Sequence, residues 1–133
     1  MTEGERKALL AAAFAARRNS YAPYSEYPVG AAVLCEDGTI FSGCNVENAS
    51  YPAGLCAERN ALGSAAAAGR RHFKALAVCG SETSLTMPCG ICRQWLAEFR
   101  VPLVLCARSE QDYECFTTEE LLPHAFGEEG LKK

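Results

Sequence analysis

Apolar residues near the start of the chain recur with a spacing of three to four, which predicts an amphipathic helix over residues 3–18. Leu10, Ala13 and Phe14 fall on one face of this helix. Two prolines follow, at Pro23 and Pro28, and proline does not fit a helix interior. The helix is therefore expected to end before them and to lead into an irregular segment.

Five later runs, rich in apolar residues, have the short length typical of strands. The first two are separated by Glu36-Asp37-Gly38, and Asp-Gly is a strong hairpin signal. The third and fourth are nearly continuous apolar runs, as expected of buried strands. The predicted strands cover residues 29–35, 39–47, 72–80, 101–108 and 113–117.

Two more helices are predicted at residues 56–69 and 89–100. The first is rich in small residues that allow close packing on a sheet. The second should place its large apolar residues on one side; these are Ile91, Trp95, Leu96 and Phe99. A last short helix should follow Thr117, because Glu120 lies three residues further on and completes a capping box.

This order of helices and strands predicts an α/β fold with three layers, α/β/α, built on a mixed sheet of about five strands with helices on both faces. The chain has 133 residues, which is enough for one domain with a proper core. We therefore expect a single domain over residues 1–133, with residues 1–3 and 127–133 frayed.

The composition excludes several classes of function. The net charge is −3, so no basic surface indicates binding to nucleic acid. No segment has the roughly 18 consecutive apolar residues of a membrane-spanning helix, and the N-terminal stretch lacks the pattern of a signal peptide. The chain has eight cysteines, and we expect a cytoplasmic protein, in which a Cys-x-x-Cys pair serves metal binding or catalysis rather than a structural disulfide.

Three cysteines stand at or near helix starts: Cys56 opens one predicted helix, Cys89 opens another, and Cys92 lies one turn further on. Helix N-termini favour thiolates, which are zinc ligands. Three ligands leave the fourth tetrahedral position open for water, which is the catalytic arrangement. Glu58 lies two residues after Cys56, where a general acid or base would be needed. Zinc deaminases carry this split pattern of Cys-x-Glu and Pro-Cys-x-x-Cys.

Other interpretations of the cysteines remain open at this point. Cys89 and Cys92 could form a redox pair, since such pairs also open helices. A structural zinc site would need a fourth ligand such as Cys44 or Cys79. The cysteines outside the motif are expected to be small buried apolar side chains; these are Cys35, Cys44, Cys79, Cys106 and Cys115.

Several longer segments together resemble the small cytidine deaminases, of the type with a three-cysteine zinc site, within the cytidine and deoxycytidylate deaminase superfamily. The matching segments are YAPYSEYPVGAAVL, GCNVENASY, CAER, PCGICRQ and ELLPHAF, in the family's order and spacing over residues 21–126. The resemblance implies the family's fold and its activity. That activity is the hydrolysis of cytidine and 2′-deoxycytidine to uridine and 2′-deoxyuridine plus ammonia, in pyrimidine salvage.

The resemblance also implies roles for the motif residues. Cys56, Cys89 and Cys92 would hold one zinc ion per chain, and zinc-bound hydroxide would attack C4 of the pyrimidine. Glu58 would shuttle protons from that water to N3 and to the departing amine. Arg59 would donate to a cysteine sulfur and offset the negative charge of the thiolates.

Substrate contacts are implied in the same way. Asn45 and Glu47 would bind the ribose hydroxyls, and the backbone N–H of Ala57 would meet the pyrimidine carbonyl. Tyr27 stands where relatives commonly have a phenylalanine that lines the nucleoside pocket. Phe126 matches an aromatic residue that reaches a neighbouring subunit's site, which implies a homotetramer with shared active sites.

Arg93 and Gln94, which follow Cys92, are expected to support the zinc site. Three alternatives to nucleoside deamination are kept: a polynucleotide deaminase, a blasticidin-type or free-base deaminase, and a zinc-binding module without turnover. The acidic composition argues against the first. The NVEN segment at residues 45–48, with its ribose-binding pair, favours a nucleoside over the second.

Overall fold

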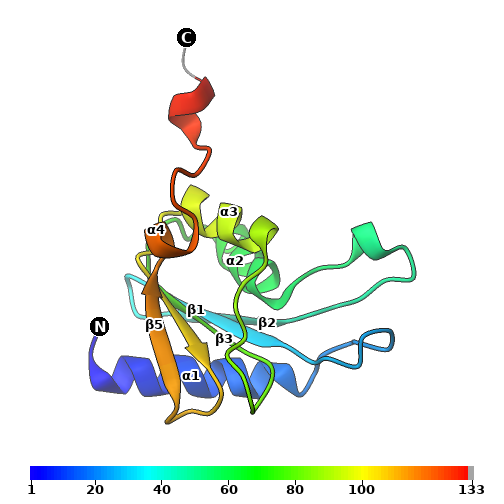
Figure 1. Ribbon diagram of the computed structural model, residues 1–133. Helices are drawn as coiled ribbons and strands as arrows, with labels where there is room; N and C mark the ends of the chain where they lie inside the picture. The colour runs from blue at the N-terminus through cyan, green and yellow to red at the C-terminus, as the bar shows by residue number, and fades with distance from the viewer. Residues whose placement is uncertain (132–133) are drawn as a thin grey trace.

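A five-stranded sheet lies between one long helix and three others in the computed structural model, which describes residues 1–131 (Figure 1). The helices are α1 (Glu3–Arg17), α2 (Ala57–Ala67), α3 (Gly90–Glu98) and α4 (Thr118–Leu121). The strands are β1 (Gly30–Cys35), β2 (Ile40–Cys44), β3 (Phe73–Cys79), β4 (Leu103–Ala107) and β5 (Tyr113–Thr117). The predicted three-layer α/β/α fold with a mixed sheet is thus confirmed.

The strands follow the order β2-β1-β3-β4-β5. β1 pairs antiparallel with both β2 and β3, β3 and β4 are parallel, and β5 returns antiparallel to β4. Two antiparallel connections are tight, and the hairpin between β1 and β2 turns at Gly38 with a φ of 90°. The parallel pair needs a longer crossover, and the segment that contains α3 supplies it.

Each face of the sheet has its own apolar core. On one face Leu9 and Leu10 of α1 pack with no more than 1% exposure. On the other face Ala61 and Leu62 of α2 pack together with Leu96 of α3. Small residues on both sides let the helices lie close to the sheet. α2 and α3 therefore share one face of the sheet, opposite α1.

At one edge of the sheet the start of β1 lies beside the ends of β2, β3 and β4, and the site is built from the segments attached there. Gly30 at the start of β1 pairs with Cys44 at the end of β2 and with Cys79 at the end of β3. Cys79 in turn pairs with Ala107 at the end of β4. The segments that follow β2 and β3, and the one that precedes β1, therefore begin side by side.

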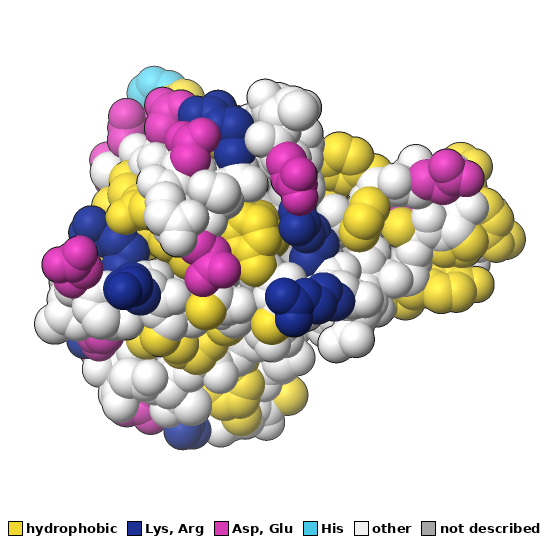
Figure 2. All heavy atoms as spheres, turned by 90° about the horizontal axis from the view of Figure 1, so that it is seen from below, with side chains coloured by type: hydrophobic (Ala, Val, Ile, Leu, Met, Phe, Trp, Pro, Cys, Tyr) yellow, Lys and Arg dark blue, Asp and Glu magenta, His cyan; other side chains and the backbone are white. Residues whose placement is uncertain are grey.

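Two of these segments, residues 20–28 and 46–55, extend together from the body, and we call them the projecting arm (Figure 1). Val46 joins them, because it forms bridges with both Tyr21 and Leu55. The arm includes the short 3-10 helix η1 (Tyr51–Ala53). Hydrophobic side chains gather at its outer end (Figure 2). The exposed large apolar residues of the arm are Tyr21, Tyr24, Tyr27, Val46, Tyr51 and Leu55.

The structure corrects three local predictions. β2 ends at Cys44 rather than at residue 47, because the chain turns there to enter the projecting arm. Ile91 does not share the buried side of α3: it is 60% exposed, since the buried face is set by Cys92 and Leu96, one turn apart. Cys115 on the outer strand β5 is exposed, contrary to the expected burial.

The remaining cysteines outside the motif differ among themselves. Cys35, Cys79 and Cys106 are buried in strands as expected, whereas Cys44 is only half-buried. Burial raises the pKa of the Cys79 thiol to about 11 and that of the Cys106 thiol to about 12. Such thiols stay protonated and behave as apolar side chains.

The chain ends were expected to fray. At the N-terminus, Thr2 instead caps α1 in a capping box with Glu5. At the other end, the tail beyond α4 leads away from the body to a single 3-10 turn, η2 (Glu128–Leu131) (Figure 1); residues 132–133 of that prediction lie outside the described residues. Within residues 1–131, no helix combines the length and hydrophobicity needed to cross a membrane.

Candidate active site

Three cysteine sulfurs from two helix starts come together, as the sequence predicted. The Sγ atoms of Cys56, Cys89 and Cys92 all lie within 4.8 Å of one another. Cys56 is the N-cap of α2, Cys89 is the N-cap of α3, and Cys92 lies in the first turn of α3. Neither N-cap side chain accepts a capping hydrogen bond from a backbone N–H of its helix, so neither sulfur is used as a cap.

The cluster fits zinc as its occupant. Tetrahedral zinc with bonds of about 2.3 Å separates two thiolate sulfurs by about 3.8 Å, and the Sγ atoms of Cys56 and Cys89 are 3.8 Å apart. Among residues 1–131, no fourth histidine, cysteine or carboxylate joins the group. The closed site that Cys44 or Cys79 would complete is therefore not formed. Three soft ligands with an open position are the donor set of a catalytic zinc.

Arg59 lies beside this cluster, as expected, and its Nη2 donates to the Sγ of Cys56 over 3.4 Å. Hydrogen bonds from the Cys92 thiol and from Arg59 lower the pKa of Cys56 to about 5. Cys92 shows the opposite behaviour: its pKa is raised, first because its thiol donates to Cys56 and then by burial. A thiolate therefore forms first at Cys56, next to the guanidinium.

Glu58 lies in the first turn of α2, and its side chain is only 4% exposed. No other side chain among the described residues forms a hydrogen bond with its carboxyl group. Burial is the main cause that raises the pKa of Glu58 to about 7, and the charge of Cys56 adds to it. A carboxyl group with these surroundings can both take up and release a proton near neutral pH.

Ala57 is buried at the first position of α2. Its backbone N–H belongs to the first turn, where no preceding helical carbonyl can accept it. Among residues 1–131 no acceptor bonds to it. The N–H is thus a free donor between Cys56 and Glu58.

Asn45 and Glu47 are close together but lie beyond β2, and both side chains hold the projecting arm. Asn45 Oδ1 accepts from the backbone N–H of Val29 over 2.9 Å and from the hydroxyl of Ser20. Asn45 Nδ2 donates to the carbonyl oxygen of Tyr27 over 2.9 Å. The amide therefore fixes the segment that enters β1.

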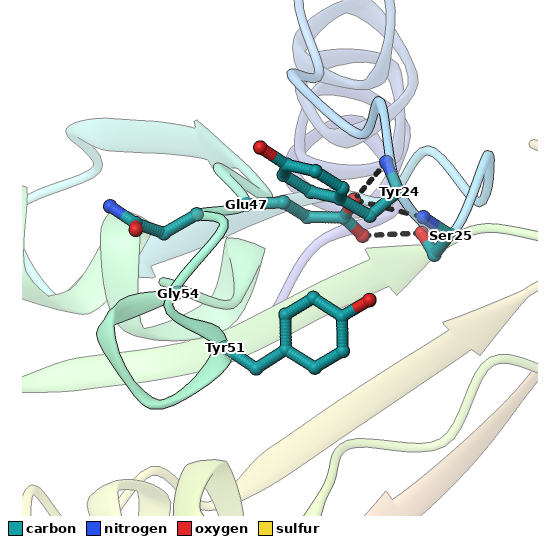
Figure 3. A pocket seen from close by; sticks show the side chains of 6 residues that line it. Tyr24, Ser25, Glu47, Tyr51 and Gly54 are labelled. Carbon is teal, nitrogen blue, oxygen red and sulfur yellow. Dashed lines mark hydrogen bonds between the residues drawn. The ribbon is translucent and has the colours of Figure 1, made fainter.

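Glu47 binds the turn of the projecting arm. Its Oε1 accepts the backbone N–H groups of Tyr24 and Ser25, each over 3.0 Å, and its Oε2 accepts the Ser25 hydroxyl (Figure 3). These hydrogen bonds, from Ser25 first, lower the pKa of Glu47. A pocket of about 280 Å³ adjoins it, lined by Tyr24, Ser25, Glu47, Asn48, Tyr51 and Gly54.

The sequence prediction missed two residues of this pocket, Tyr24 and Tyr51, whose rings are 6.0 Å apart and tilted by 57°. A signal was present, because each tyrosine lies in a segment that also carries a predicted site residue: Tyr24 with Tyr27, and Tyr51 with Glu47. Aromatic side chains in irregular segments next to chemistry-bearing residues are candidates for ligand contact. Only the fold shows that two distant tyrosines share one pocket.

Gln94 contacts the chain at Phe126, and no hydrogen bond joins either residue to the sulfur atoms of the three-cysteine cluster within residues 1–131. The Phe126 side chain is 60% exposed on the C-terminal tail. Gln94 Nε2 donates to the Phe126 carbonyl oxygen over 2.6 Å. The contact seen for Gln94 is therefore with the tail. The neighbouring Arg93 Nε donates to the carbonyl oxygen of Pro88, the residue before Cys89, over 2.7 Å.

Comparison with known proteins agrees with this geometry. The family model described as cytidine and deoxycytidylate deaminase zinc-binding region matches residues 3–108. The cytidine deaminase of Sporosarcina psychrophila is 48% identical over 126 residues, which is 92% of each chain. The cytidine deaminase of Halalkalibacterium halodurans is 42% identical over 129 residues, covering 96% of this chain and 98% of the relative.

Solved structures are similar over the same extent. The crystal structure of cytidine deaminase from Burkholderia pseudomallei has a TM-score of 0.86 and 48% sequence identity, and covers 95% of this chain and 100% of that one. Cytidine deaminase from Mycobacterium tuberculosis gives a TM-score of 0.81 at 36% identity, with 96% and 99% coverage. These relatives share both the fold and most of the chain length.

Proposed function

The chain belongs to the cytidine and deoxycytidylate deaminase family, and we propose that it hydrolyses cytidine and 2′-deoxycytidine. In this reaction water adds to C4 of the pyrimidine, and the C4–N4 bond then breaks. The products are uridine or 2′-deoxyuridine and ammonia, so the protein would act in pyrimidine salvage. The observation that carries the proposal is the open three-sulfur cluster with a buried carboxyl group in the adjoining helix turn.

Cys56, Cys89 and Cys92 would hold zinc, which when bound lowers the pKa of water from about 15.7 toward about 7 and so supplies hydroxide at neutral pH. Glu58 would accept one proton from the attacking water and pass it to N3. It would then take the proton of the new C4 hydroxyl group and deliver it to the leaving amine, as the C4 carbonyl forms and the C4–N4 bond breaks. Its burial supports this role, because a proton held there is not exchanged with bulk water at once.

Asn45 and Glu47 would bind the ribose with the hydrogen-bonding capacity they have left. One N–H of the Asn45 amide is used in the contact with Tyr27, and the amide has a second to donate. Glu47 accepts three hydrogen bonds, and a carboxylate has about four acceptor positions. The pair can therefore add sugar hydroxyls without giving up the projecting arm. The free N–H of Ala57 would take the pyrimidine carbonyl.

We also propose a homotetramer in which Phe126 reaches the site of a neighbouring subunit. Support comes from the large apolar side chains left on the surface of one chain. Tyr51 is 74% exposed, and Ile91 and Phe126 are each 60% exposed. Exposed apolar surface of this kind marks protein interfaces. Gln94 would support the site indirectly, by fixing the tail that carries Phe126.

The whole chain would work as one domain in the cytoplasm, on a free nucleoside. The net charge of −3 argues against a polynucleotide substrate. Free cytosine would leave Asn45 and Glu47 without sugar hydroxyls to bind. We therefore rank nucleosides above free bases as substrates.

The direct test incubates purified protein with cytidine, 2′-deoxycytidine and free cytosine, and follows the deaminated product and ammonia. Zinc per chain is measured on the same sample. Turnover of both nucleosides with about one zinc per chain is the expected result. Zinc binding without turnover of any of the three would contradict the proposed reaction and favour a zinc-binding module.

Shared sites are tested by mixing two defective variants. Glu58→Gln lacks the proton carrier of its own site, and Phe126→Ala lacks the group given to a neighbour. In hybrid tetramers formed by co-refolding, Phe126→Ala subunits receive Phe126 from Glu58→Gln subunits and should regain activity. A monomer in light scattering, or a mixture no more active than its parts, would overturn the assembly.

A further inference from the structure

The hydroxyl of Tyr27 joins two segments that carry different parts of the site. β1 and β3 pair so that Gly30 lies opposite Cys79. The segment before β1 and the loop after β3 are therefore neighbours. Tyr27 Oη lies 3.1 Å from Thr86 Oγ1 and accepts the backbone N–H of Ser81 over 3.1 Å. The same N–H also reaches Thr86 Oγ1 over 3.1 Å, so the three groups form a closed triangle.

The triangle lies directly against the backbone of Gly80. A Cβ atom at Gly80 would come within 2.6 Å of Thr86 Oγ1, 2.8 Å of Tyr27 Cε1 and 2.9 Å of Tyr27 Oη. Contacts this short do not occur, so any side chain at position 80 would push the phenol and the threonine hydroxyl away. The absence of a side chain there is what allows the three groups to meet.

Both sides of the triangle are fastened to proposed site residues. On one side, Asn45 Nδ2 donates to the carbonyl oxygen of Tyr27. On the other side, Thr86 is buried and lies two residues before Pro88, which is also buried. Cys89 follows at once as the N-cap of α3. A continuous path thus leads from Asn45 through the Tyr27 hydroxyl to a zinc ligand.

We propose that Tyr27 is a positioning residue, whose hydroxyl fixes the loop of residues 81–88, and with it Cys89, relative to the segment held by Asn45. This inference rests on the proposed function and deepens it. A phenylalanine at this position would keep the ring but could not form the triangle. The effect therefore belongs to the hydroxyl and is separable from stacking on the nucleoside.

The test compares Tyr27→Phe, Thr86→Val and the double variant with the wild type. Two readouts do not depend on turnover: the rate of zinc release to a chelator and the hydrogen exchange of the Ser81 amide. We expect zinc release about tenfold faster in Tyr27→Phe, in the range seen when partners of metal ligands are removed. Ser81 exchange should rise most in the double variant, because only there are both acceptors lost.

Two controls separate positioning from general loss of stability. Thr86→Ser keeps the hydroxyl and should release zinc at the wild-type rate. Tyr113→Phe removes a hydroxyl on β5, 3.4 Å from Arg6 Nη1, and should leave zinc release and Ser81 exchange unchanged. With cytidine, Tyr27→Phe should lower kcat several-fold with little change in KM.

The proposal is overturned if Tyr27→Phe releases zinc as slowly as the wild type and Ser81 exchanges at the wild-type rate. It is also overturned if Tyr113→Phe speeds zinc release as much as Tyr27→Phe does. Failure of the proposed function gives a different result, since the wild type would then not deaminate nucleosides. The release and exchange rates would still report on the triangle.

Discussion

The starts of α1 and α2 are built for different purposes, although each carries a glutamate in its first turn. α1 begins with a complete capping box between Thr2 and Glu5. Glu5 also forms an ion pair with Lys74 over 2.8 Å. α2 begins with Cys56, whose side chain does not cap the helix, and buries Glu58 without a side-chain partner among the described residues.

The pKa values of the two carboxyl groups differ accordingly. Hydrogen bonding to Lys74 lowers the pKa of Glu5 to about 2, whereas burial raises that of Glu58 to about 7. The first arrangement stabilises the fold, and the second costs stability. α3 follows the pattern of α2, with Cys89 as an N-cap that does not bond its helix. The helix starts without side-chain caps are those that bring together the three cysteines of the proposed zinc site.

The largest effect should come from giving α2 an ordinary cap. Cys56→Ser replaces a zinc ligand with a good N-cap, so zinc content should fall and turnover should drop roughly ten-thousandfold or more. The metal-free protein should gain about 0.5–1 kcal/mol in free energy of unfolding. Metal analysis, kinetics and urea unfolding measure the three changes.

Thr2→Ala provides the matched change at α1. It should cost about 1 kcal/mol of stability and leave zinc content and turnover unaltered. If Cys56→Ser kept its zinc and its activity, the contrast between the two helix starts would be lost.

The next effect concerns the glutamates themselves. Glu58→Gln keeps the shape but cannot carry a proton, so kcat should fall about a thousandfold while zinc stays bound. The metal-free protein should be no less stable, because a buried carboxyl group is removed. Glu5→Gln should do the reverse, with normal kcat and a lower urea midpoint at neutral pH. Retained turnover in Glu58→Gln would remove that residue from its proposed role.

A smaller effect is expected from Arg59, which donates to Cys56. Arg59→Gln should weaken zinc binding or turnover about 10- to 100-fold, as is typical when a group that bonds a metal ligand is lost. Arg71, an exposed residue after α2 whose Nη1 bonds the Ala66 carbonyl, is the control. Equal losses in Arg59→Gln and Arg71→Gln would show a general electrostatic effect instead.

The smallest effect is the pH dependence of the α1 start. The folded-state pKa of Glu5 lies below its ordinary value of 4.5, so folding favours the charged form. The stabilisation by Lys74 is therefore complete above about pH 4.5 and is lost as the pH falls toward 2. Urea midpoints of the wild type and Lys74→Met should differ at neutral pH and converge over this interval. A difference that persists at pH 2 would contradict this origin.

The fold was largely predictable because its signals are local. Alternation of apolar runs with turn residues gives every strand, and Thr117 with Glu120 gives the last cap. Ile91 was placed on one side of α3 together with Trp95, Leu96 and Phe99 because all four are apolar. The helix turns by about 100° per residue, and Cys92 rather than its neighbour faces the sheet, which periodicity over nine residues could not decide.

The metal-binding motif was also predictable, because its residues lie within short, specific segments. The contacts between segments were not. That the Tyr27 hydroxyl meets Ser81 depends on the pairing of β1 with β3. That Gln94 bonds the chain at Phe126 depends on the path of the tail. Such contacts join residues far apart in sequence, and no spacing rule encodes them.

The strand order also sets the time at which metal can enter during folding. The β1–β2 hairpin is local and can form within microseconds. β3 joins the sheet only after the longer segment with α2 has closed, and β4 only after α3. Cys56 and Cys89 flank β3 in the sequence, so their sulfurs meet only when the centre of the sheet is in place. Zinc uptake would therefore report a late step, and added zinc would speed completion of folding rather than its beginning.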